Sequence, residues 1–85
     1  MTYEVSQAVD QMVHFEREYL RLSGMVSAAI AANQPAPTET YAWQRRQNAD
    51  AQEAYDTYLS QTFDAFTVVF IRGRARAIAM HGTAA

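Results

Sequence analysis

An apolar side chain recurs at alternating intervals of three and four residues through the first thirty positions of the sequence. The members of this seam are Val5, Ala8, Met12, Phe15, Tyr19, Leu22, Val26 and Ala29. Such spacing is the heptad pattern of a helix that packs along one side against another helix. The seam therefore predicts one long helix over about residues 3–32.

Signals at both ends of this segment agree with a helix. Thr2 can act as the N-cap by accepting a hydrogen bond from an unpaired backbone N–H, and Glu4 in the first turn suits the helix dipole. Asn33 can take the left-handed position after the last turn, and two prolines in the following loop, residues 33–38, prevent the helix from continuing. A loop this short predicts that the next helix is an antiparallel neighbour.

The apolar part of the first helix is unusually wide. A second stripe lies beside the seam and consists of Val9, Val13, Leu20 and Ile30. Together the two stripes span roughly 160° of the helix, against the ~100° that an ordinary surface helix buries. Because one neighbouring helix cannot cover this arc, we expect the first helix to contact more than one partner.

The rest of the chain predicts a second helical region over about residues 39–80. Two weak points divide it: residues 48–50, where an Asp and a Glu at capping-box spacing favour a new helix start, and Gly73. Residues 63–71 are almost entirely apolar on every side, so a helix here must be surrounded. The end of this stretch also has high β propensity, but its helical flanks and the lack of a partner strand favour a helix.

These elements predict an all-α fold in a single domain, residues 1–85. It is a long antiparallel helical hairpin that pairs with a second copy as a two-fold dimer, giving a four-helix bundle, because one chain leaves its apolar faces half covered. The residues expected at the interface between copies are Val9, Val13, Leu20, Phe63, Phe66 and Phe70. The alternative is a small monomer in which residues 74–81 fold back as a short third helix.

Charge and composition exclude several function classes. Seven basic residues, all Arg, and nine acidic residues give a net charge of −2, which argues against a general nucleic-acid coat and a basic membrane-surface helix. The start of the sequence does not resemble a secretory signal, and the longest uncharged run is too short to span a bilayer. We therefore expect a cytoplasmic protein that has no membrane partner.

Chemistry-bearing groups are sparse. Asp10, His14 and Glu18 follow each other at intervals of four and share one side of the first helix, but His81 is the only other histidine and there is no cysteine. We interpret the three as a solvated helix face and expect no metal and no cofactor. Without a thiol, a Gly-rich phosphate loop or a nucleophilic serine in a suitable turn, the sequence does not predict an enzyme.

One cluster after the proline loop has the composition of a protein-binding site. It consists of Tyr41, Trp43, Arg45 and Arg46, followed by the acidic residues Asp50 and Glu53. Trp, Tyr and Arg are the side chains most enriched in binding hot spots, because each offers a large contact area with a polar group. The alternative interpretation is that Trp43 closes the open end of the core and the arginines are solvated.

The arginines near the C-terminus support a second hypothesis. Arg72, Arg74 and Arg76 could hold an anion, and they directly follow a stretch, residues 48–71, that carries four acids and no base. The leading hypothesis is a non-enzymatic, homo-oligomeric interaction protein that binds or occludes a protein partner. In type, though in no motif, it resembles mobile-element inhibitors such as anti-CRISPR proteins. The alternative is a small nucleic-acid or nucleotide binder that uses the three arginines.

Overall fold

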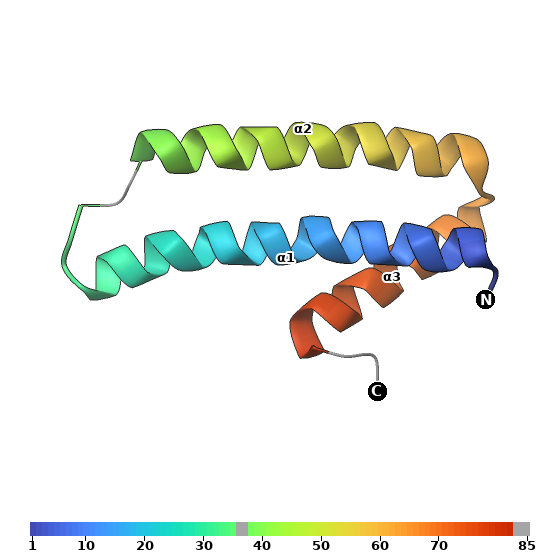
Figure 1. The fold of residues 1–85 in the computed structure, drawn as a ribbon, viewed down its shortest axis with the longest axis horizontal. Coiled ribbons are helices and arrows are strands. Elements are labelled where there is room, and N and C mark those ends of the chain that lie inside the picture. The colour runs from blue at the N-terminus through green and yellow to red at the C-terminus, as the bar shows by residue number, and fades with distance from the viewer. Residues whose placement is uncertain (36–37, 83–85) are drawn as a thin grey trace.

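A computed structural model describes residues 1–35 and 38–82, and these residues form three helices (Figure 1). They are α1 (Tyr3–Ala31), α2 (Thr38–Thr62) and α3 (Ala65–His81). The prediction of an all-α fold is confirmed for this part of the chain. Within it no helix combines the length and apolar character needed to cross a bilayer. Residues 36–37 of the expected loop lie outside the described residues.

The ends of α1 form as the sequence predicts. The Thr2 side chain accepts a hydrogen bond from the Val5 backbone N–H at 3.3 Å. At the other end Asn33 has a φ of 53°, in the left-handed region. The backbone N–H groups of Asn33 and Gln34 donate to the carbonyls of Ile30 and Ala29, at 3.1 and 2.9 Å. These bonds close the last turn as a Schellman motif, which satisfies two carbonyls that would otherwise lack a partner.

The break in the second helical region lies elsewhere than expected. The helix is continuous through residues 48–50 and again through Gly73, and it is interrupted instead at residues 63–64. There Asp64 adopts an extended backbone and its carboxylate accepts the Thr67 N–H at 2.8 Å, which makes it the N-cap of α3. A single mid-helix glycine costs only about 1 kcal/mol, so Gly73 does not end the helix.

The new helix start changes the architecture. A third helix forms, but it begins at Ala65 rather than near residue 74, so it is seventeen residues long. Figure 1 shows α2 returning beside α1, while α3 starts near the end of α2, crosses behind α1 at an angle and ends below the middle of α1. The long α1 thus packs against both of the other helices, as its wide apolar arc requires.

The core occupies one end of the molecule. It is built from the first half of α1, the end of α2 and the inner face of α3, and consists of Ala8, Val9, Met12, Val13, Phe15, Leu59, Val68, Ile71 and Ala75. The ring of Tyr55 packs against that of Phe15 with centroids 5.8 Å apart. Val9 and Val13, which we expected between two copies, are therefore buried within one chain, in a core that α2 and α3 complete.

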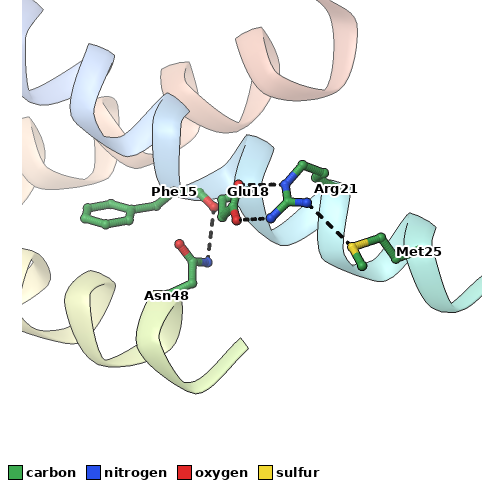
Figure 2. A network of polar contacts seen from close by, with 5 residues as sticks. All are labelled: Phe15, Glu18, Arg21, Met25 and Asn48. Carbon is green, nitrogen blue, oxygen red and sulfur yellow. Dashed lines mark hydrogen bonds and ion pairs between the residues drawn. The ribbon is translucent and has the colours of Figure 1, made fainter. Parts of the chain in front are cut away.

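Beyond the end of α3, the second half of α1 and the first half of α2 form a two-helix extension that we call the distal arm. Leu22 is the one described residue of the arm that is fully buried. A side-chain hydrogen bond joins the helices at the base of the arm, from the Asn48 amide to the Phe15 carbonyl at 3.4 Å (Figure 2). The side-chain oxygen of Gln44 is buried there without a hydrogen-bond partner. The arm is thus much less well packed than the core.

We expect Asp64→Ala to lower the melting temperature by a few degrees, because it removes the cap that begins α3.

The hydrogen bond from Thr67 holds the pKa of the Asp64 carboxyl below its ordinary value. A carboxyl whose pKa falls on folding stabilises the protein at higher pH and loses that effect as pH drops through the lowered pKa. The advantage of wild type over Asp64→Asn, which keeps a cap but does not ionise, should therefore disappear in acid. Thermal melts across the acid range test this, and a constant difference would contradict it.

Candidate interaction surfaces

The outer side of α2 displays the sole tryptophan. Trp43 is 63% exposed, so the interpretation that it closes the core does not hold. Arg46, Asp50 and Glu53 follow it at intervals of three, four and three residues, which places all four on one side of the helix. We call this set the Trp43 face. It combines one large aromatic group with charges of both signs, and all four side chains are exposed.

The structure separates the other two residues of the predicted cluster from this face. Tyr41 is half-buried and lies on the side of α2 that turns toward α1, together with Gln44 and Asn48. Arg45 is exposed and follows Tyr41 by one turn, so it is displaced from Trp43 around the helix. The sequence grouped these residues by proximity in the chain, whereas the helical repeat divides them between two sides.

The three C-terminal arginines do not form one basic surface. Arg72 donates from Nε and Nη2 to one carboxylate oxygen of Asp56, at 3.2 and 3.1 Å, which joins α3 to α2 within the chain. Arg76 lies on the same side, in a shallow groove that also contains the carboxylate of Glu16. Arg74 is half-buried and leaves the helix on the other flank. Two carboxylates beside Arg72 and Arg76 oppose the binding of an anion there.

One residue from each of the acidic and basic blocks that are adjacent in the sequence thus forms an ion pair within a single chain. The Asp56–Arg72 pair is partly exposed, with a third to a half of each side chain open to solvent. Pairs of this kind contribute about 0.2–1 kcal/mol. Its main effect is to orient α3 against α2 rather than to supply much stability.

The acidic and histidine residues of α1 remain a solvated face. Asp10 and His14 are exposed and border a shallow polar depression. Glu18 is engaged by Arg21, whose Nε donates to it at 3.0 Å (Figure 2), and this contact holds the pKa of the Glu18 carboxyl below its ordinary value. Among residues 1–35 and 38–82, no three potential ligands come close enough together to hold a metal ion.

The outer side of α3 is largely apolar, with Arg72 and Arg76 exposed along one edge of it. Its exposed apolar members, which we call the α3 stripe, are Phe66, Val69, Phe70, Gly73, Ala77 and Met80. The buried residues Val68, Ile71 and Ala75 lie on the opposite side of the same helix. Phe66 is 90% exposed. Residues 63–71 are apolar on almost every side, but only one side of this stretch is buried.

The six residues that we expected between copies fall into two groups. Val9 and Val13 are in the core and Phe63 is half-buried against it, whereas Leu20, Phe66 and Phe70 are exposed. Sequence reasoning missed Val69, Gly73 and Met80 as members of the same surface. Their helical intervals from Phe66, of three, seven and fourteen residues, place them on one side of the helix. The sequence does not say whether that side faces the core, because the start of the helix is apolar all round.

The fold and these surfaces define a small all-α protein with two exposed candidate interaction surfaces, the Trp43 face and the α3 stripe. No family model matches the chain, and the comparisons with curated proteins and with solved structures found no match. The functional conclusion therefore depends on the residues themselves.

Proposed function

We propose that this chain is a non-enzymatic interaction protein that binds a protein partner through the Trp43 face and also associates with itself. The observation that carries the proposal is the exposure of Trp43 on the outside of α2. A tryptophan buries more apolar area in an interface than any other side chain, and Trp and Arg dominate binding hot spots. In the described structure Trp43 contributes nothing to the core, so its indole is free for a partner.

The neighbouring charges would set which partner fits. Arg46 and Asp50 lie one and two turns along α2 from Trp43, with Glu53 beyond them. A partner with an apolar pocket for the indole and complementary charges around it would match this arrangement, because rim charges guide orientation and rate of association. Occlusion of a partner's own binding surface is the mode of action that a small protein without catalytic groups can achieve.

Self-association is supported by the amount of surface that one chain leaves exposed. The accessible surface is 6091 Å², whereas a compact monomer of this mass exposes about 5,100 Å². The radius of gyration is 14.9 Å, against about 12 Å for a compact domain of this length. A four-helix bundle of two hairpins would use Val9 and Val13 between the copies. Since these are buried in one chain, the association we propose uses the apolar side chains that remain exposed.

Trp43→Ala tests the partner-binding part of the proposal. Because the indole is mostly exposed, the melting temperature of the variant should stay within about 2–4 °C of wild type, as surface substitutions change stability by less than ~0.5 kcal/mol. Affinity capture from cells of the source organism should lose a protein that wild type retains. As the sole tryptophan, Trp43 also reports binding directly, through a blue shift of its fluorescence when the partner buries it.

Phe66→Ala is the matched control, since it removes an exposed aromatic side chain from a different helix. We expect it to retain the protein that Trp43→Ala loses. If both variants captured the same proteins as wild type, the Trp43 face would not be a binding site.

A further inference from the structure

The α3 stripe has a feature that nothing inside the chain explains. Gly73 lies at its centre, in mid-helix, where glycine is less favourable than alanine by about 1 kcal/mol. A Cβ atom built on Gly73 would meet nothing within 4 Å. Packing within the monomer therefore does not require a glycine, whereas the close approach of another helix would.

The residues of the stripe are arranged evenly about this glycine. Phe66 and Met80 lie seven residues before and after it, and Val69 and Ala77 lie four before and four after. If two copies of α3 cross antiparallel at Gly73, the residues before Gly73 on one helix face the residues after Gly73 on the other. The bulky side chains before Gly73 would then pack against the less bulky ones after it. A parallel pair would place Phe66 on Phe66 and leave a gap where Gly73 and Ala77 meet their counterparts.

We infer that the α3 stripe is the contact between two copies of this chain, packed antiparallel around a two-fold axis at Gly73. The inference rests on the self-association in the proposed function and names its contact. In this register Phe66 of one copy meets Met80 of the other. A shallow apolar groove next to Phe66, formed with Met1, Val5 and Phe70, receives that methionine. Methionine suits an irregular groove because its side chain is unbranched and adaptable.

The surface that the chain leaves exposed agrees with a second copy as the occupant, and the arginines determine how its association responds to salt. The whole chain, including the distal arm, exposes about 1,000 Å² more than a compact monomer, and a standard interface takes ~800 Å² from each partner. Arg76 would lie opposite Phe70 of the other copy, where a guanidinium can stack on the ring. Arg74 would approach its own counterpart at the rim. Salt screens that repulsion, so association should tighten as salt is added.

Other occupants predict the reverse response to salt. An anionic bilayer or an acidic partner helix would be attracted by the flanking arginines, and salt would weaken either complex. The net charge of −2 also makes the whole chain a poor match to an anionic surface. A flat bilayer gives no role to a glycine in the middle of the stripe.

Cysteine crosslinking tests the contact directly, since the chain has no cysteine of its own. Gly73→Cys would place the thiols of two copies beside the axis, and we expect mild oxidation to link most of the protein into dimers. Gly24→Cys is the matched control, because Gly24 is also an exposed helical glycine whose added Cβ meets nothing within 4 Å, yet it lies on α1. The control should stay monomeric over the same time on a non-reducing gel.

The register has its own test. A mixture of Phe66→Cys and Met80→Cys should form mixed crosslinks faster than either variant links to itself. Preferential linking of Phe66→Cys to itself would show a parallel pair and overturn the antiparallel register.

Gly73→Leu separates the dimer from a membrane contact. The added side chain overpacks the crossing point and should weaken dimerisation by about tenfold or more, while helix content is kept or raised because a glycine is removed. Gly24→Leu should leave the dimer unchanged. Binding to vesicles that contain phosphatidylglycerol, strengthened by Gly73→Leu and weakened by salt, would overturn the inference in favour of a bilayer.

Sedimentation distinguishes failure of the inference from failure of the proposed function. One chain has a mass of 9.6 kDa, and we expect twice that mass at high micromolar concentration. A dimer in which Gly73→Cys links no faster than Gly24→Cys would overturn the α3 contact and leave self-association intact. A single-chain mass at every concentration would overturn both the α3 contact and self-association. It would not affect the proposal that Trp43 binds a partner, which the capture experiment measures separately.

Discussion

Ile71→Ala is expected to lower the free energy of unfolding by about 3 kcal/mol, from the usual range for truncating a buried isoleucine or leucine. Ile71 is 0% exposed and belongs to the core that holds α3 against α1. The substitution removes apolar contacts and leaves a cavity that the surrounding helices fill only partly. Since the total stability of a domain of this size is about 4–13 kcal/mol, a large share of it should be lost. Urea denaturation followed by circular dichroism measures the change.

Val69→Ala is the matched control for this prediction. Val69 lies two residues away on the same helix but is 68% exposed. At concentrations below those of the proposed self-association, its truncation should change the free energy of unfolding by less than about 0.5 kcal/mol. Similar effects at the two positions would mean that α3 does not bury the face that the structure assigns to the core.

Leu22→Ala is the second substitution with a large expected effect, and that effect should be local. Leu22 is 2% exposed, yet it lies outside the main core, in the distal arm. Removing it should destabilise the pairing of the two arm helices by about 2–4 kcal/mol. Because no third helix covers the arm and the Gln44 side-chain oxygen is already unpaired there, the arm should then open without unfolding the core.

Hydrogen exchange measured residue by residue distinguishes the two cases. In Leu22→Ala the backbone amides of the distal arm should exchange much faster, while those around Leu59 and Ile71 keep their protection. In Ile71→Ala protection should fall throughout the chain. Uniform acceleration in Leu22→Ala would contradict a separately opening arm, and it would show instead that the arm and the core unfold as one unit.

Opening of the arm bears on the proposed function, because Trp43 and Arg46 lie on it. A face carried by a loosely packed helix pair can adapt to a partner, but ordering the arm on binding costs free energy. A substitution that stabilises the arm would then tighten binding even though the substituted residue does not contact the partner.

Much of the fold follows from local sequence alone. The seam from Val5 to Ala29 determines α1, the Thr2 cap determines where it begins, and Asn33 marks where it ends, because each depends only on backbone geometry within one or two turns. These features can be predicted without knowing which helices pack against each other.

Tertiary packing decided the rest. Both residues 48–50 and Asp64 carry capping signals, and only the second begins a helix, because a start there lets Val68 and Ile71 reach the core on α1. Val9 and Phe70 looked equally suited to an interface between copies, yet one is buried and the other exposed. A helix that is apolar on every side carries no periodic signal for its inner face. Contact with α1 chose that face, and left Phe66 and Gly73 on the outside.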